Sequence, residues 1–154
     1  MLSNPVLKRN NVKVIGNGQQ VILFAHGFGC DQNAWQFVVN DFIDDYKVVL
    51  FDYTGSGQSD ITQYKKEKYN QINGYTQDLI EICNALKITK AIFVGHSVSA
   101  MIGLLAANKH PEYFSRLIFI GPSPRYLNTE NYIGGFEQHD LESLFEFMDS
   151  NYLV

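Results

Sequence analysis

The chain has 154 residues, of which 45% are hydrophobic and 18% are charged, and this is enough for one globular domain with a buried core. Its net charge of −4 provides no basic surface for nucleic acid or for an anionic membrane. The N-terminal residues show no signal-peptide pattern, and the longest apolar stretch, 100–107, is far too short to cross a bilayer. We therefore expect a cytoplasmic protein whose two cysteines, Cys30 and Cys83, are reduced thiols.

Strand patterns alternate with helical patterns along the chain, which is typical of a mostly parallel α/β sheet with helices on both faces. The first strand is short and ends at a Gly-Asn-Gly turn. The next four are apolar nearly throughout, which predicts strands that are buried on both faces. The expected strands are residues 12–15, 21–25, 47–51, 91–94 and 117–120.

Four helices are expected between and after these strands. Asp31 is placed to cap a short first helix. Residues 72–86 carry one apolar face at helical spacing, whereas 100–108 are apolar nearly all round and predict a buried helix that ends before Pro111. The tail, 136–152, predicts an amphipathic helix after a polar loop rich in Tyr and Asn.

The strongest motif covers residues 95–99 (Gly-His-Ser-Val-Ser), which join the expected strand 91–94 to the helix that follows. A serine on such a sharp strand-to-helix turn has strained backbone angles, and its hydroxyl is lifted clear of the sheet. The turn leaves little room two residues before and after the serine. Gly95 meets this need, and Ser99 is small enough but is expected to fit more loosely than glycine. The motif predicts that Ser97 is a nucleophile.

A serine that attacks a carbonyl needs backbone N–H groups that stabilise the resulting oxyanion. One donor is the N–H of the residue after the nucleophile, here Val98. The other comes from the loop after an earlier strand, and residues 26–29 (His-Gly-Phe-Gly) follow strand 21–25. We expect the N–H of Phe28 to be this second donor.

Four histidines offer candidates for a general base. We expect His26 and His96 to position their own loops, His110 to complement a helix C-terminus, and His139 to be solvated. A triad on this kind of turn runs Ser, acid, His along the chain, and none of the four fits that order. No spacing of His, Cys or Asp resembles a metal site, and residues 55–57 (Gly-Ser-Gly) indicate a turn rather than a phosphate loop. No metal or cofactor is therefore expected.

Several segments together resemble the RsbQ-like family of α/β-hydrolases, which includes a regulator of sigma-B and the plant karrikin and strigolactone receptors. The resemblance extends over nearly the whole chain. It implies an α/β-hydrolase core over residues 1–124 and the beginning of a helical lid over 125–154. The segments that carry it are residues 26–32, 51–60, 95–98, 121–128 and 134–137.

The resemblance also implies functional residues and partners. Ser97 would be the nucleophile, and Phe28 and Val98 the oxyanion donors. The ligand would be small, hydrophobic and ester- or lactone-like, and the RsbQ branch implies a PAS-domain phosphatase as a protein partner in stress signalling through sigma-B. The residues expected to line an apolar pocket are Gly27, Phe28, His96, Tyr126, Phe136 and Phe145.

The resemblance implies that the chain stops within the lid, so the acid and the base of the triad are expected beyond Val154. The chain alone is then expected to be marginally folded, aggregation-prone and without esterase turnover, because strand 117–120 would present an open apolar edge. Two other interpretations stay open. One is a metabolic carboxylesterase without a signalling role, and the other is a non-catalytic ligand-binding module.

Overall fold

The computed structural model describes residues 4–151 and divides into two compact units, Met1–Pro122 and Ser123–Val154. Each unit is described by itself. Residues 152–154, the end of the expected lid segment and of the expected tail helix, lie outside the described residues. Within the described residues, no helix has both the length and the hydropathy needed to cross a bilayer.

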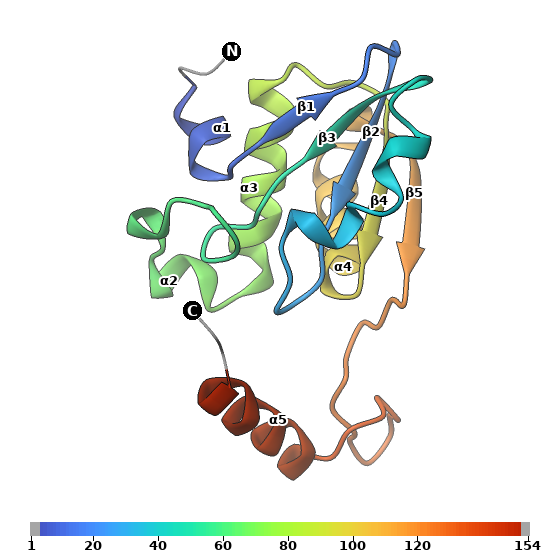
Figure 1. Cartoon of the computed structure of the whole chain (residues 1–154). Coiled ribbons are helices and arrows are strands. Elements are labelled where there is room, and N and C mark those ends of the chain that lie inside the picture. The colour runs from blue at the N-terminus through green and yellow to red at the C-terminus, as the bar shows by residue number, and fades with distance from the viewer. Residues whose placement is uncertain (1–3, 152–154) are drawn as a thin grey trace. The chain divides into compact units, whose positions relative to one another are not determined.

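The first unit contains a five-stranded sheet in the order β1-β3-β2-β4-β5 (Figure 1). β1 is antiparallel to β3, and the other neighbours run parallel, so the expected mostly parallel sheet is confirmed. The strands are β1 Lys13–Ile15, β2 Gln20–Ala25, β3 Tyr46–Leu50, β4 Ala91–His96 and β5 Phe114–Ile120.

The four expected helical segments are present in the predicted order, and two short α-helices, Pro5–Arg9 and Lys66–Tyr69, were not expected. Asp31 caps the first short helix as expected, because its side chain accepts a hydrogen bond from the N–H of Asn33, but that helix is a single 3₁₀ turn. Further 3₁₀ turns lie at Val39–Asp41, Ile61–Gln63 and Pro111–Tyr113. The α-helices are α1 Pro5–Arg9, α2 Lys66–Tyr69, α3 Ile72–Ala85, α4 Val98–Lys109 and, in the second unit, α5 Gln138–Asn151.

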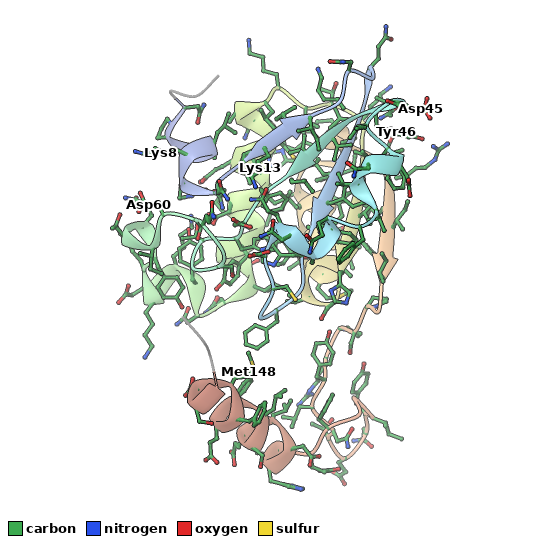
Figure 2. All side chains as sticks on the ribbon, in the orientation of Figure 1. Lys8, Lys13, Asp45, Tyr46, Asp60 and Met148 are labelled. Atoms are coloured by element: carbon green, nitrogen blue, oxygen red, sulfur yellow. The ribbon has the colours of Figure 1, made fainter. Side chains whose placement is uncertain are left out.

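The central strands bury both faces of the sheet, as their apolar sequences predict. Successive residues of a strand point to opposite faces, so alternate side chains join two different cores. One core packs against α3 and α4 and includes Leu23, Val49 and Phe93. The other includes Ile22 and packs against the segment around Trp35. Figure 2 shows the side chains that fill the space on both sides of the sheet.

Two apolar elements are partly exposed: α4, which was expected to be a buried helix, and β5, for which an open apolar edge was expected in this chain alone. In α4 only one face is covered, and Leu104 on the other face is 38% exposed. Among the described residues β5 pairs only with β4, and Ile118 and Ile120 are 47% and 45% exposed. A helix contacts a sheet through one face, and an edge strand lacks a neighbour on one side, so apolar composition alone overstates the burial of both.

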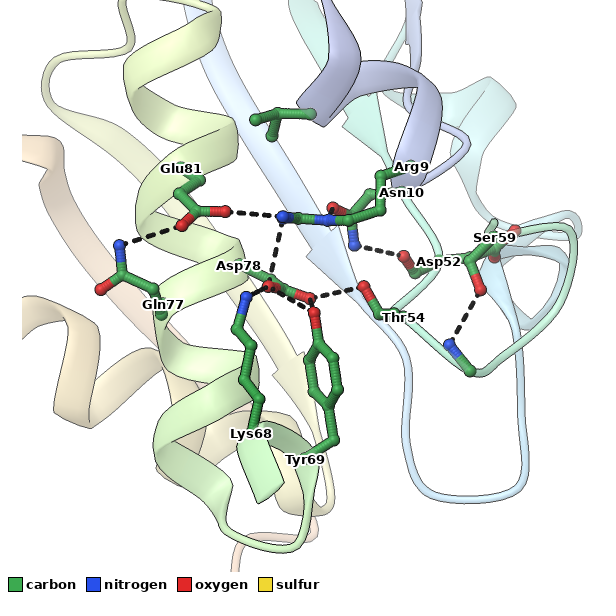
Figure 3. Close-up of polar contacts among 12 residues, drawn as sticks. Arg9, Asn10, Asp52, Thr54, Ser59, Lys68, Tyr69, Gln77, Asp78 and Glu81 are labelled. Atoms are coloured by element: carbon green, nitrogen blue, oxygen red, sulfur yellow. Dashed lines mark hydrogen bonds and ion pairs between the residues drawn. The ribbon is translucent and has the colours of Figure 1, made fainter. Parts of the chain in front are cut away.

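A buried carboxylate joins the helices to the loop after β3 (Figure 3). The side chain of Asp78, on α3, is fully buried. It accepts hydrogen bonds from Thr54 Oγ1 at 2.7 Å, Lys68 Nζ at 2.7 Å and the Tyr69 hydroxyl at 3.0 Å. The guanidinium of Arg9, on α1, completes the cluster at 3.1 Å. The charge is therefore fully paired, and one side chain holds α1, α2, α3 and this loop together.

The second unit consists of a loop closed on itself and of α5. Asn128 organises the loop, since its Oδ1 accepts the N–H groups of Gly134 and Gly135 at 2.7 and 2.8 Å. Its Nδ2 donates to Glu137 Oε1 at 2.7 Å. A Cβ at Gly134 would lie 2.5 Å from the carbonyl oxygen of Tyr126, so only glycine fits there. The residues that carry the family resemblance in this segment are thus the ones that shape the loop.

Replacing Asp78 by Asn should lower the free energy of unfolding by about 3 kcal/mol, because the cations of Arg9 and Lys68 lose their buried counter-charge. Urea denaturation followed by circular dichroism measures this change. The matched control is Asp44→Asn, an exposed carboxylate whose loss should cost about 0.5 kcal/mol or less. Equal effects of the two substitutions would show that the Asp78 cluster does not hold the helices together.

Candidate active site

Ser97 has an unusual backbone conformation where β4 turns into α4. Its φ of 57° and ψ of −123° lie in a region that a residue with a side chain rarely adopts. Such a conformation costs roughly 1–3 kcal/mol and persists only where the surroundings enforce it. The N–H of Ser97 donates to the carbonyl oxygen of Ile120 at 2.8 Å, so the end of β5 helps to enforce it. The strained turn predicted for the nucleophile is present.

Close contact between strand and helix explains the small residues around this turn. A Cβ at Gly95 would lie 2.7 Å from Phe93 Cε1 and 2.8 Å from the carbonyl oxygen of Ser99. One turn further along α4, a Cβ at Gly103 would lie 2.2 Å from the same ring carbon of Phe93. The Phe93 ring therefore occupies the space that side chains at these two glycines would need. The sequence analysis did not single out Gly103, although glycine within an apolar helix indicates such a close approach.

Ser99 does not loosen the turn, contrary to the expectation from the sequence. It is fully buried, and its hydroxyl donates to the carbonyl oxygen of His26 at 2.5 Å. The Tyr53 hydroxyl lies 2.9 Å from the same Oγ. Ser99 therefore adds a connection, which glycine could not make, between α4, the loop after β2 and the loop after β3.

The loop after β2 lies directly against the turn that holds Ser97. Ala25, the last residue of β2, pairs with Gly95 in β4, so both chains leave the sheet side by side. A Cβ at Gly27 would lie 2.6 Å from His96 Nδ1 and 3.3 Å from Ser97 Cβ. The structure thus brings Gly27, His96 and Ser97 together.

The two residues expected as oxyanion donors lie in the same turn and loop. Phe28 follows Gly27 in the loop and is 64% exposed. Val98, the other expected donor, is the first residue of α4. Their roles as donors to an oxyanion stay predictions.

The His26 ring positions this loop, as expected. Nδ1 lies 2.9 Å from the carbonyl oxygen of Gly27, and Nε2 accepts the N–H of Tyr53 at 3.2 Å. These partners select the neutral tautomer with the proton on Nδ1. Burial, the largest influence, lowers the pKa of His26 below its ordinary value of 6.5. Burial also raises the pKa of the Tyr53 hydroxyl above its usual range, so that group stays protonated.

Two other histidines have different roles. His110 follows the last turn of α4, at the opposite end from Ser97, where its Nδ1 lies 2.9 Å from Glu112 Oε1. His139, in α5 of the second unit, lies 3.2 Å from Asp140 Oδ1 and is 78% exposed. Both nitrogens of His26 are engaged, and His110 lies at the opposite end of α4 from Ser97. Neither histidine is therefore placed to act as a base for Ser97.

Asp52, two residues after the end of β3, is a buried group that the sequence analysis missed. Its carboxylate accepts the backbone N–H of Gln32 at 2.9 Å and of Gln58 at 3.0 Å. It also accepts the side-chain amide of Asn11 at 2.8 Å. Its position after a buried strand was the available signal, but nothing in the sequence identifies its partners.

The remaining predicted pocket residues belong to the second unit. Tyr126 and Phe136 lie together, because the N–H of Phe136 donates to the carbonyl oxygen of Tyr126 at 3.1 Å. Phe145 lies in α5 and is 49% exposed. A shared pocket with Gly27 and Phe28 stays a prediction. The described residues contain no group of His, Cys, Asp and Glu that could hold a metal ion, and Cys30 and Cys83 are free thiols.

The free energy of unfolding should be about 1 kcal/mol higher for Ser97→Gly than for Ser97→Ala, because glycine adopts a positive φ without strain. Both variants lose the same hydroxyl, so thermal or urea unfolding isolates the backbone contribution. The same pair at Ser115, in β5, is the control. There the order should reverse, since glycine in a strand costs about 0.5–1 kcal/mol relative to alanine. The same order at both positions would contradict strain at Ser97.

The free energy of unfolding should fall as the pH drops below 6.5. The pKa of His26 is lower in the folded protein than in the unfolded chain. As the pH falls below 6.5, the unfolded chain therefore binds a proton before the folded protein does, and this proton stabilises the unfolded state. The contribution of His26 is complete above pH 6.5 and is lost as the pH falls toward the folded pKa. Urea denaturation across this window should give a flatter profile for His26→Gln, and identical slopes would show that His26 does not titrate there.

Comparisons with known proteins agree with this geometry. The model of a family described as the alpha/beta hydrolase fold matches residues 20–153. The chain is 46% identical over 147 residues to karrikin insensitive 2 receptor CA of Petunia hybrida, which covers 96% of this chain and 54% of that protein. It is 45% identical over 152 residues to strigolactone esterase RMS3 of Pisum sativum, covering 98% and 57%.

The solved structure of a hydrolase from Oleispira antarctica superposes with a TM-score of 0.90 at 42% identity, over 96% of this chain and 55% of that one. The chain spans about half the length of the curated relatives that it matches. The family match, the sheet order and the strained serine between β4 and α4 agree. The chain therefore belongs to the α/β-hydrolase family.

Proposed function

We propose that this chain carries the nucleophile and oxyanion hole of a serine hydrolase that acts on, or senses, a small hydrophobic ester- or lactone-like ligand. The observation that carries the proposal is the backbone of Ser97, with φ 57° and ψ −123°, directly against Gly27. This conformation costs stability, and exposing a nucleophile is the function that accounts for it.

The chemistry follows from the placement of these groups. Ser97 Oγ attacks the carbonyl carbon of the ligand, its proton passes to a general base, and the carbonyl oxygen becomes an oxyanion. The N–H groups of Val98 and Phe28 stabilise that oxyanion. The base is a histidine supplied by neither His26 nor His110, whose contacts serve other purposes. Without a base Ser97 remains an ordinary alcohol, so residues 1–154 alone should have at most weak residual turnover.

The names of the relatives support both turnover of a ligand and sensing of a ligand. One relative is named a receptor and another an esterase, and each is more than 40% identical to this chain. The exposed ring of Phe28 beside Gly27 provides an apolar contact for an uncharged ligand. A metabolic carboxylesterase and a binding module without turnover use the same residues, and the dependence of turnover on Ser97 separates the module from the enzymes.

Within this proposal we place the protein in the RsbQ-like branch, as a sigma-B regulator that works with a PAS-domain phosphatase. The support is the loop from Tyr126 to Glu137, whose resemblance to that branch involves the residues that shape it. These are Asn128, Gly134, Gly135 and Glu137. Loops of this kind vary more among hydrolases than the nucleophile turn does.

Ser97→Ala, in the natural polypeptide that carries this chain, should lower the turnover of short p-nitrophenyl esters on the order of 10⁶-fold. The reason is that alanine has no hydroxyl to attack the carbonyl. The control is Ser123→Ala, a serine outside the turn, which should leave turnover unchanged. A Ser97→Ala protein that keeps a tenth of the activity removes Ser97 from the mechanism. A wild-type protein that binds such esters without turnover favours the ligand-binding module.

A further inference from the structure

We propose that the hydroxyl groups of Tyr53 and Ser99 are positioning groups that hold the backbone N–H of Phe28 in place for the oxyanion. The proposal rests on the function proposed above. It concerns a chain of three buried polar groups that connects the loop after β3, the first turn of α4 and the loop after β2.

The direction of the hydrogen bonds in this chain is determined by the acceptor at its end. A carbonyl oxygen only accepts, so the Ser99 hydroxyl donates its single proton to the carbonyl oxygen of His26. The contact of 2.9 Å between Tyr53 and Ser99 must then have the Tyr53 hydroxyl as donor. The relay runs from Tyr53 to Ser99 to His26, and aligned hydrogen bonds of this kind strengthen one another.

Tyr53 also holds the ring of His26. Its backbone N–H donates to Nε2, while Nδ1 donates to the carbonyl oxygen of Gly27. The N–H of Cys30 donates to that same carbonyl oxygen at 3.3 Å. The carbonyl groups of two successive peptides, those of His26 and Gly27, are thus both held by donors.

The carbonyl group of Gly27 determines the direction of the Phe28 N–H, and that of His26 holds the peptide before it. The carbonyl of Gly27 and the N–H of Phe28 belong to one planar peptide, and the described chain contains no cis peptide. In a trans peptide the two groups point in opposite directions, so holding the oxygen aims the N–H. The relay through Ser99 holds the preceding peptide and therefore the start of the same loop.

Burial makes the relay sensitive to the loss of a single hydroxyl. Tyr53 is 4% exposed and Ser99 is fully buried, so water cannot replace a missing partner. Glycine or alanine at position 99 would satisfy the space requirement of the turn and leave the carbonyl of His26 without this donor. The serine at this position is therefore explained by its hydroxyl and not by its size.

The test compares Tyr53→Phe and Ser99→Ala with Tyr69→Phe in the natural polypeptide that carries this chain. Tyr69 is a matched control, because its hydroxyl is also buried and donates to a carboxylate, that of Asp78, which lies outside the relay. Losing an oxyanion donor outright costs about 10²–10³ in kcat, so a displaced donor should cost about tenfold. Tyr53→Phe and Ser99→Ala should each show this loss with KM nearly unchanged.

The double variant, Tyr53→Phe with Ser99→Ala, should be about as slow as either single variant, because both substitutions break one relay. Tyr69→Phe should lower stability and leave kcat unchanged, because Asp78 keeps its contacts with Thr54, Lys68 and Arg9 and so still holds the loop after β3. Equal kcat losses in all three single variants, or a loss confined to KM, would overturn the positioning role. Turnover that does not depend on Ser97 in the unsubstituted protein would instead overturn the proposed function.

Amide hydrogen exchange tests the relay without turnover. The N–H groups of Tyr53 and Cys30 donate to the held loop, so both should exchange faster in Ser99→Ala and Tyr53→Phe than in Tyr69→Phe. Unchanged exchange at these two amides would show that the hydroxyls do not hold the loop, whatever the kinetics are.

Discussion

The structure depends on one residue, Ser97, that must keep a positive φ between a buried strand and a helix. Three features act together to maintain this conformation. The carbonyl of Ile120 accepts the N–H of Ser97, the ring of Phe93 packs against Gly103 and draws α4 onto β4, and the absence of a side chain at Gly95 leaves room for the backbone of Ser99. Strain at Ser97 is therefore opposed by the packing of the strand and the helix that flank the turn.

Buried polar side chains then determine how the loops lie around that turn. Asp78 holds the helices to the loop after β3, and the carboxylate of Asp52 accepts hydrogen bonds from the backbone N–H groups of Gln32 and Gln58. Both carboxylates are satisfied by several donors, which is what makes their burial tolerable. The loops that carry Phe28 and Tyr53 are therefore held in place by buried polar contacts of the fold itself.

The neutral state of His26 connects this arrangement to pH. A histidine with Nδ1 donating and Nε2 accepting is useful as a rigid bridge only while it stays unprotonated, and burial lowers its pKa. The same contacts remove it from acid–base chemistry. A histidine near a strained serine turn can thus be a structural part of the neighbouring loop, and its hydrogen bonds distinguish that role from a catalytic one.

The sequence by itself determined the strands, the order of the four longer helical segments and the position of Ser97 between β4 and α4. Local signals carry this information: apolar runs such as 21–25 must be buried, and glycine and serine are spaced for a sharp turn. Only the tertiary structure decided that one face of α4 is exposed and that Ser99 is a hydrogen-bond partner. The partners of Ser99, Tyr53 and Asp78 are distant in sequence. The identity of a polar residue does not predict which distant donor or acceptor will lie next to it in the folded chain.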